Sequence, residues 1–407
     1  MKILFLTDNF WPEVNAPASR TLEHCRHWVR AGAEVTVITS APNFPAGRVF
    51  DGYRNRLWQH EEVEGIRVVR VWTYMARNEG FFRRICDYLS FAATSFAAGL
   101  FEKADVIVAT SPQFFTTWSG WALSVLKRRP WIFELRDIWP ESLAAVGAMR
   151  SGMVLRLLER IELGLYDRAA HVVAVSPAFV DNLAGRGVPR DKVSVVTNGV
   201  ELGAFGPRAA DPALRRSLGL EGKFVLGYLG THGMAHALDF VVEAAAQGMP
   251  PQAHFLFIGD GAGKAAAVEL AKRLGAGNTT FLPPVPRDRI ADYLALCDVS
   301  LVPLRRSDTF LSVIPSKMFE AAAMRLPILL GVDGQAREIV EGHDAGLFFE
   351  PEDAAAFRAA VHRLATDPAL MARLRDGAAR MAADYDRARL AATMLAKIEA
   401  VAGQASR

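Results

Sequence analysis

The sequence predicts an α/β protein built from two doubly wound parallel-sheet halves. Three observations support this prediction. Short apolar runs alternate with amphipathic helical patterns along the whole chain, as in sheets covered by helices on both faces. At 407 residues the chain is longer than one hydrophobic core usually serves. The alternation stops at residues 199–220, which are rich in Gly, Pro and Ala and are typical of a linker between domains.

The first half opens with the strand-like run "KILFLT", followed by a polar loop and an amphipathic helix around Ser19–Arg30. The segment "AGAEVTVIT" then predicts a turn and a second strand. Later apolar runs bounded by turn signals predict the remaining strands of this half: "GIRVVRV", "ADVIVAT", "PWIFEL", "HVVAVS" and "KVSVVTNG". We therefore expect a Rossmann-like domain over residues 1–200.

The second half repeats the pattern after the expected linker. Its predicted strands are "KFVLGYLG", "HFLFIGDG", "NTTFLPPV", "VSLVPL", "PILLGV" and "AGLFFEP". An Ala-, Arg- and Leu-rich pattern over residues 354–402 predicts helices. We expect a second Rossmann-like domain over residues 201–384, and we expect the C-terminal helix, about 385–407, to complete the first domain.

Composition excludes several protein classes. Apolar content of 51% and charged content of 22% describe an ordinary globular protein, and a net charge of +3 gives no reason to expect nucleic acid as a partner. Residues 1–200 carry 24 Lys and Arg against 20 Asp and Glu, and the remainder carries 23 against 24, so the first half is mildly basic. The three cysteines form no C-x-x-C pair, which favours the reducing cytosol.

Two segments bear on targeting and membranes. The opening "MKILFLTDNFWP" has an apolar run too short for a signal peptide and is interpreted as a strand. Residues 106–126 carry no charge over 21 positions, nominally enough to span a bilayer. Pro112, Gln113 and several Ser and Thr interrupt that run, so a strand at Val106–Thr110, a loop and a helix are the better interpretation.

Glycine-rich turns follow predicted strands, where open α/β sheets bind ligands. "GYLGTHGMAHALD" follows the first strand of the second half, and "FIGDGAGK" follows the next. The second motif is neither a P-loop nor a complete G-x-G-x-x-G, because the spacing is short and Ala265 stands where a Ser or Thr would bind magnesium. Tight strand-to-helix turns remain an alternative explanation of these glycines.

The stretch "SVIPSKMFEAAAM", residues 312–324, predicts the start of a buried helix. Pro315 presets the backbone, Ser316 is an N-cap candidate, and Lys317 and Glu320 lie one turn apart on the same side. A helix N-terminus with a lysine attracts anions. The alternative is a structural helix on which Glu320 reaches back as a capping-box acceptor.

Several motifs together resemble family 4 of the GT-B glycosyltransferases. These motifs are "AGAEVTVITS", "VVAVSPAFVDNLAGRGVPRDKVSVVTNGVELGAF", "FIGDGAG", "CDVSLVPL" and "PSKMFEAAAMRLPILL", and they occur in the family's order over nearly the whole chain. Within the family, "ELRDIWPES" and "IPSKMFEAAA" resemble a subgroup of L-fucosamine (N-acetyl-L-fucosamine) transferases of surface-polysaccharide synthesis. The resemblance implies the GT-B fold, with two Rossmann-like domains facing a cleft.

The resemblance also implies how a nucleotide sugar, expected to be a UDP-sugar, is held. The family's Glu-x7-Glu pair places its second glutamate at Glu320, implied to bind the ribose hydroxyls, and its first at Ser312. A neutral serine cannot hold a sugar diol as a carboxylate does, so the departure suits a deoxy or N-acetylated donor sugar. Pro315 and Ser316 belong to the same implied donor site.

A second departure concerns the diphosphate. Many relatives place Arg directly after the glycine that corresponds to Gly230, and Lys five residues later. This chain has Thr231 and His236 there. We expect the missing positive charge to come from Lys317 first, with Arg305 and Arg20 as further candidates, because cations near a departing diphosphate stabilise the transition state. The remaining donor-site candidates are Gly259 and Asp260.

The first half is implied to bind the acceptor. "PEVNAPASR", after the first strand, gives the acceptor or phosphate loop candidates Asn15, Ala16, Ser19 and Arg20.

In "FELRDIWPES", Arg136 replaces a family histidine, while Asp137 keeps its place. Asp137 or Glu141 is expected to orient or deprotonate the acceptor hydroxyl. A structural ion pair between Arg136 and Asp137 is the alternative.

The family implies transfer with retention at the anomeric carbon, without a protein nucleophile. Asp384–Asp386 forms the chain's D-x-D, in the helical C-terminal region, so we expect neither a metal nor another cofactor.

The expected second substrate is a lipid-linked or oligosaccharide acceptor. The protein is expected to work at the inner face of the cytoplasmic membrane. Residues 80–101 and 118–131 interleave aromatic and basic side chains, as in helices that bind a membrane surface without spanning it. The alternative is that Phe91, Phe96 and Trp121 belong to the core. A UDP-sugar 2-epimerase and a non-catalytic sugar-nucleotide-binding relative are the competing functions.

Overall fold

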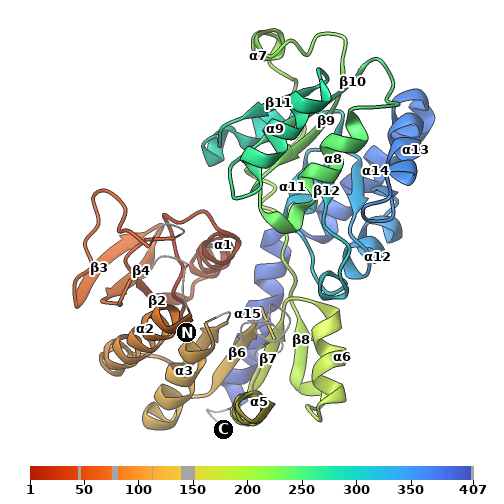
Figure 1. Ribbon diagram of the computed structural model, residues 1–407. Helices are drawn as coiled ribbons and strands as arrows, with labels where there is room; N and C mark the ends of the chain where they lie inside the picture. Colours follow the sequence, from red (N-terminus) through yellow and green to blue (C-terminus); the bar gives the residue numbers. More distant parts are fainter. Residues whose placement is uncertain (45–46, 76–80, 112, 139–151, 405–407) are drawn as a thin grey trace. The chain divides into compact units, whose positions relative to one another are not determined.

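The computed structural model describes residues 1–44, 47–75, 81–111, 113–138 and 152–404. The chain forms two compact units (Figure 1). Unit 1 comprises Met1–Thr197 and Arg387–Arg407, and unit 2 comprises Asn198–Asp386. The C-terminal segment therefore returns to the first unit. The division lies within three residues of each boundary expected from the sequence.

Unit 1 contains an eight-stranded sheet in the order β3-β4-β2-β1-β5-β6-β7-β8, in which β3 alone is antiparallel to its neighbour. Its strands are β1 (Lys2–Leu6), β2 (Glu34–Ser40), β3 (Trp58–Val63), β4 (Ile66–Val71), β5 (Val106–Thr110), β6 (Trp131–Leu135), β7 (His171–Ala174) and β8 (Val193–Val195). The sequence did not predict β3, because "WQHEEV" alternates between exposed and half-buried residues at the sheet edge and contains no apolar run.

Helices cover both faces of this sheet. They are α1 (Ala16–Arg30), α2 (Phe81–Phe101), α3 (Phe114–Lys127), α5 (Gly152–Arg168), α6 (Pro177–Gly185), the short η1 (Arg190–Lys192) and α15 (Arg387–Gln404). Alternate side chains of β1 point to opposite faces of the sheet and so belong to two different hydrophobic cores. Leu4 and Leu6 pack with Phe91 of α2, whereas Ile3 and Phe5 pack with Trp28 of α1. The sheet is doubly wound, as predicted.

The C-terminal helix α15 completes the second of these cores. The Trp28 indole N–H donates to the carbonyl of Ala391 at 2.9 Å. Arg387 forms a buried ion pair with Glu23 of α1 at 2.8 Å. Ile398 is fully buried beside them in the same core. Unit 1 is thus built from both ends of the chain.

Residues 106–126 fold as the strand β5, a loop and most of α3, which confirms the interpretation made from the sequence. All five residues of β5 are buried, as in the central strand of a parallel sheet. Among the described residues, no helix carries an apolar stretch long enough to cross a bilayer.

Unit 2 contains a six-stranded parallel sheet in the order β11-β10-β9-β12-β13-β14. Its strands are β9 (Phe224–Leu229), β10 (Ala253–Ile258), β11 (Thr279–Leu282), β12 (Val299–Pro303), β13 (Ile328–Gly331) and β14 (Gly346–Phe348). Its helices are α7 (Pro212–Ser217), η2 (Met234–His236), α8 (Leu238–Ala245), α9 (Lys264–Leu274), η3 (Arg287–Arg289), α10 (Ile290–Leu294), η4 (Asp308–Phe310), α11 (Lys317–Ala323), α12 (Gln335–Gly342), α13 (Ala354–Thr366) and α14 (Pro368–Asp384).

Residues 199–220 belong to unit 2, so the prediction of a linker there was wrong. Val200, Phe205 and Leu220 are buried in the core of that unit. The segment also forms α7, whose N-terminus is capped by the Asp211 side chain. Three widely spaced apolar residues anchor this stretch, and they were too sparse to form a strand pattern.

In both sheets the order in which strands are added reverses at the first strand of the unit. In unit 1 the chain leaves β1 for β2 on one side and returns to β5 on the other. In unit 2, β9 lies between β10 and β12 in the same way. Ligands of open α/β sheets bind at the carboxyl ends of strands beside such a reversal. Ligand sites are therefore expected at the loops after β1 and β5 in unit 1, and at the loops after β9, β10 and β12 in unit 2.

Candidate active site

Two glycine-rich loops meet at the carboxyl ends of β9 and β10. The Gly230 N–H donates to the carbonyl of Ile258 at 2.9 Å. Gly230 and Gly259 have φ values of 138° and 145°, which side chains rarely adopt. A Cβ on Gly259 would lie 1.8 Å from the Gly230 carbonyl oxygen. Glycine at position 259 is therefore required by the close approach of the two loops.

His232 continues this contact between the loops. Its N–H donates to the carbonyl of Asp260 at 2.8 Å, and its carbonyl accepts from the Gly263 N–H at 2.7 Å. A Cβ on Gly261 would lie 2.6 Å from the His232 carbonyl oxygen. These backbone bonds hold the two loops as one surface at the end of the sheet.

Lys317, the first residue of α11, extends toward the end of β9. Its ammonium lies 3.6 Å from the centre of the Tyr228 ring, a cation–π contact. It also lies beside Gly230, where an added Cβ would stand 3.2 Å from Nζ. Nζ is buried and has no hydrogen-bond partner in the part of the chain that the structure describes. Burial lowers the pKa of Lys317 to about 7, against the opposing effect of the Glu320 carboxylate.

Two histidines lie in the same loop. His232 is fully buried, and neither ring nitrogen has a hydrogen-bond partner among the described residues. Burial, together with the positive charge of Lys317 and, for His232, that of Lys264, lowers the pKa values of His232 and His236 to about 4. Both imidazoles are therefore neutral at pH 7. The sequence analysis did not single out His232, although its place between two glycines of "GTHG" was a signal.

The other residues predicted for the donor site after β9, β10 and β12 have defined partners. Arg305 is paired with Asp239 at 2.6 Å and with Glu352 at 3.0 Å, so its charge is largely neutralised within unit 2. The Asp260 carboxylate accepts from the N–H of Gly261. The Thr231 carbonyl accepts from the Tyr228 hydroxyl at 2.5 Å.

The start of α11 differs from the prediction. Ser316 precedes the helix, but its side chain makes no capping hydrogen bond. The reason is its backbone: φ −58° and ψ −28° are already helical, whereas an N-cap side chain reaches back from an extended residue. The Pro315 carbonyl accepts from Met318 in the first turn. Ser312 lies in the loop before it, and Glu320 lies half-buried in the first turn.

In unit 1, the loop after β1 leads into α1. The Asn15 carboxamide accepts from the N–H of Ala18 at 2.9 Å and so caps the helix, while its amide donates to Asn9 at 2.7 Å. Ala16 is the first residue of α1, and Ser19 follows in its first turn. The three predicted residues thus stand at one helix end beside the reversal of the sheet.

Arg20 is almost fully buried and is engaged within unit 1. Its guanidinium pairs with Glu134 at 2.9 Å and donates to the carbonyls of Val196 and Thr197 at 2.8 and 2.5 Å. These bonds join α1 to β6 and to the segment after β8. Of the three cations predicted to serve a diphosphate, Arg20 and Arg305 are hydrogen-bonded to carboxylates, whereas the Lys317 ammonium makes no hydrogen bond to a described residue.

Arg136 and Asp137 follow β6. Both backbone N–H groups donate to the Ser111 hydroxyl, at 2.8 and 3.3 Å. The Arg136 guanidinium donates to the Pro17 carbonyl at 3.4 Å, and burial lowers its pKa to about 9. Glu141, the third residue predicted there, lies outside the described residues.

The sequence analysis did not identify two carboxyl groups near β1, those of Asp8 and Glu13. The Asp8 carboxyl accepts from Asn9 and Gln113, and burial, with repulsion from Asp87 and Glu13, raises its pKa well above the usual value. Burial likewise raises the pKa of Glu13. One oxygen of each carboxyl has no donor. Acidic residues directly after the first strand were the available signal, but their burial could not be predicted.

Comparison with known proteins assigns the chain. Residues 15–199 match the family model described as "Glycosyl transferase 4-like domain", and residues 223–367 match "Glycosyl transferases group 1". The chain is a glycosyltransferase. The two matched segments correspond to the two units, and together they span most of the sequence.

This glycosyltransferase is similar to WcaI of Escherichia coli (strain K12), whose name assigns it to colanic acid biosynthesis. The two are 27% identical over 335 residues, which cover 80% of this chain and 81% of WcaI. It is 25% identical over 237 residues to an alpha-galactosylglucosyldiacylglycerol synthase of Streptococcus pneumoniae, covering 56% of this chain and 60% of that protein.

Among solved structures, HepE of Anabaena in complex with UDP and glucose matches with a TM-score of 0.71 and 18% identity, over 98% of this chain and 100% of HepE. The fold is GT-B, as the resemblance implied.

Proposed function

We propose that the protein is a retaining, metal-independent glycosyltransferase that uses a UDP-sugar, with the donor bound by unit 2 at the loops after β9 and β10. The observation that carries the proposal is the Lys317 ammonium. It is a buried cation beside Gly230, at the first strand of the unit 2 sheet, and no described residue forms a hydrogen bond with it. A buried, unpaired charge is costly, and an anionic ligand would offset that cost.

In this proposal Lys317 stabilises the diphosphate as it departs. Negative charge develops on the leaving phosphate while the glycosidic bond breaks, so a fixed cation there lowers the barrier. The departing phosphate accepts the proton of the acceptor hydroxyl, and no protein nucleophile is needed. The same two loops contain the other proposed donor-site residues, Gly230, Thr231, His236, Gly259 and Asp260.

Glu320 is proposed to accept hydrogen bonds from the ribose hydroxyls, and Ser312 to face the sugar. A short neutral hydroxyl at Ser312 suits a deoxy or N-acetylated sugar, for which N-acetyl-L-fucosamine is the specific proposal. Pro315 and Ser316 set the start of the helix that carries Lys317.

Unit 1 is proposed to bind the acceptor through Asn15, Ala16 and Ser19, with Asp137 or Glu141 orienting the reacting hydroxyl.

The acceptor is proposed to be a lipid-linked saccharide of capsule, O-antigen or exopolysaccharide synthesis. The relative named for colanic acid biosynthesis and the relative named as a diacylglycerol glycoside synthase support this class. The protein is accordingly proposed to work at the inner face of the cytoplasmic membrane.

The test is UDP release from a panel of UDP-sugars, with and without an undecaprenyl-diphosphate-linked acceptor and with and without EDTA. Acceptor-dependent UDP release that is unchanged by EDTA, with the product retaining the donor's anomeric configuration, is the expected result. Epimerised donor formed without acceptor indicates a 2-epimerase. Loss of turnover in EDTA, restored by a divalent metal, refutes the metal-independent mechanism.

A further inference from the structure

Helix α2 has an unusual solvent-facing side. From Cys86 onward the residues it exposes are apolar and follow one another at three- and four-residue intervals up to Leu100, with Phe101 adjacent at the end: Cys86, Leu89, Ala93, Ala97, Leu100 and Phe101. These residues are called the α2 stripe below. At 1.5 Å per residue the stripe is about 22 Å long. The outer face of a surface helix is normally polar, so this one is expected to contact something other than water.

The opposite side of α2 already packs on the sheet, so core packing does not explain the stripe. Phe91 and Ala98 are fully buried in the core of unit 1, and the Ser95 side chain is buried with them. Phe101, at the end of the stripe, is instead 77% exposed. The helix is therefore apolar on two sides, one covered by its own domain and the other open.

Charge around the stripe is positive. Arg83 precedes it and Lys103 follows it, both exposed and neither in an ion pair with a described residue. Arg84 lies over the Tyr88 ring at 5.7 Å. The one acidic residue within the helix, Asp87, is half-buried and accepts from the Thr73 hydroxyl at 2.8 Å.

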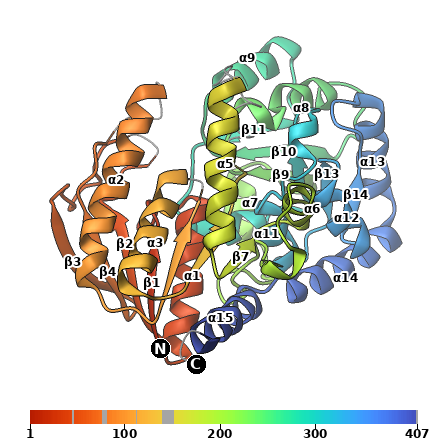
Figure 2. The ribbon, with the colours of Figure 1, turned by 90° about the horizontal axis from the view of Figure 1, so that it is seen from below.

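The end of α3 extends this surface. The Lys127 ammonium donates to the carbonyls of Leu100 and Glu102 at 2.9 and 2.8 Å, which joins the C-terminal ends of α2 and α3. The two helices run side by side in unit 1 (Figure 2). Beside this junction, α3 exposes Val125 and Leu126, by 58% and 61%. The exposed cations Arg128 and Arg129 follow directly.

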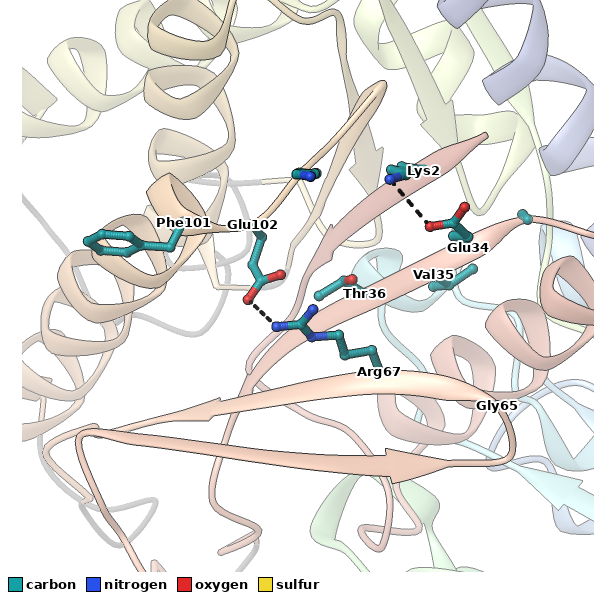
Figure 3. A pocket seen from close by; sticks show the side chains of 10 residues that line it. Lys2, Glu34, Val35, Thr36, Gly65, Arg67, Phe101 and Glu102 are labelled. Carbon is teal, nitrogen blue, oxygen red and sulfur yellow. Dashed lines mark hydrogen bonds and ion pairs between the residues drawn. The ribbon is translucent and has the colours of Figure 1, made fainter.

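A pocket of about 530 Å³ opens at the same end, along the amino ends of β1, β2 and β4 (Figure 3). Its lining residues are Lys2, Ala33, Glu34, Val35, Thr36, Gly65, Arg67, Phe101, Glu102 and Lys103. Lys2 pairs with Glu34 at 3.6 Å, and Arg67 pairs with Glu102 at 3.1 Å. Lys103 is left as one excess positive charge. Phe101 is one of the lining residues, and the centre of its exposed ring lies 5.5 Å from that of the Trp58 ring in an edge-to-face arrangement.

We propose that the α2 stripe, the end of α3 and this pocket form one docking surface for an anionic phospholipid bilayer. Helix α2 lies in the plane of the membrane with the stripe among the acyl chains, and the pocket receives a lipid phosphate beside Lys103. Apolar residues flanked by cations, with aromatic rings at the boundary, match the chemistry of an anionic interface. The inference rests on the proposed work at a membrane and names the surface that makes the contact.

Cys86 offers a direct test, because it is exposed while Cys25 and Cys297 are buried. A polarity-sensitive fluorophore on Cys86 is read with phosphatidylcholine vesicles that contain or lack phosphatidylglycerol. We expect a blue shift with the anionic vesicles that weakens as salt is raised. The control carries the fluorophore on the exposed α9 position of unit 2, in Cys86→Ser combined with Ala266→Cys, and is expected to show no shift.

Two variants separate the parts of the surface. Phe101→Ser removes the exposed ring, and Lys103→Glu reverses the excess charge of the pocket. Each is expected to weaken binding to the anionic vesicles about tenfold or more. Lys272→Glu, the same charge reversal on α9, is the matched control and is expected to leave vesicle binding unchanged.

UDP release with a water-soluble acceptor is measured in parallel and is expected to stay at the wild-type level in all three variants. Loss of vesicle binding alone therefore reports on docking, and loss of UDP release reports on the transferase. An unshifted fluorophore, or equal weakening by Lys272→Glu, overturns the proposal. So does a blue shift that appears without vesicles as protein concentration rises, which shows that a second copy covers the stripe.

Discussion

The lowered pKa of Lys317 makes a prediction about nucleotide binding that can be worked out numerically. If the ammonium must be charged to hold a diphosphate, the apparent dissociation constant rises as the charged fraction falls. With a folded-state pKa of about 7, roughly half of the side chains are charged at pH 7 and about 3% at pH 8.5. UDP is thus expected to bind about 15-fold more weakly at pH 8.5 than at pH 7.

The assay is isothermal titration calorimetry of UDP binding across this range, in buffers of different ionisation enthalpy. Wild-type protein is expected to take up close to half a proton per UDP at pH 7, rising toward one at pH 8.5. Lys317→Met should bind UDP more weakly at pH 7, with a much flatter pH dependence. Equal pH dependence and equal proton uptake in the two proteins would refute the assignment of Lys317 to the diphosphate.

The lowered pKa of Lys317 also affects the stability of the ligand-free protein. Stability is expected to rise with pH, whereas UDP binding is expected to weaken. The unfolded lysine, with a pKa near 10.4, binds more protons than the folded one above pH 7, so the cost of burying Lys317 is fully present below pH 7 and shrinks as pH rises. Without ligand, Lys317→Met is expected to stabilise the protein more at pH 6.5 than at pH 9, by roughly 2–3 kcal/mol. Urea unfolding at the two pH values measures the difference, and a gain that does not depend on pH contradicts the buried charge.

Three further variants test the proposed donor site. Glu320→Ala is expected to lower kcat/KM about 10- to 150-fold, because a charged hydrogen bond is worth about 1.5–3 kcal/mol, and unchanged kinetics would remove the ribose assignment. Ser312→Glu should shift the ranking of UDP-sugars in the donor panel, and the same ranking would mean that Ser312 does not face the sugar. Gly259→Ala should destabilise the protein and abolish UDP binding, since the new Cβ would meet the Gly230 carbonyl at 1.8 Å; a wild-type melting temperature would contradict the close contact.

The sequence predicted the sheets well because buried parallel strands are continuous apolar runs. "VIVAT" and "VSLVP" contain enough branched side chains to identify strands β5 and β12 without tertiary information. The edge strand β3 was not predicted because half of its residues face solvent. Residues 199–220 were mistaken for a linker because the three apolar residues that bury this segment in unit 2 are far apart in the sequence.

The candidate site was predictable in its residues more than in its contacts. Lys317 was identified from its place at a helix start, but its position over the Tyr228 ring depends on how α11 packs against β9. Arg20 and Lys317 are both basic residues in α helices near loops. Nothing in the sequence distinguishes Arg20, which pairs with buried Glu134, from Lys317, which has no hydrogen-bond partner among the described residues. Burial, which the sequence only implies, decides the difference.

The return of α15 to unit 1 has a consequence for biosynthesis. Thr197 and Arg387 are 190 residues apart, so at about 5–20 residues per second the ribosome needs roughly 10–40 s to supply the helix that covers Trp28. Unit 2 is contiguous, and all of it is synthesised during that interval. Until then this face of the first unit's sheet has α1 but lacks α15, and a nascent chain stalled before residue 387 would present the apolar residues that α15 covers to chaperones.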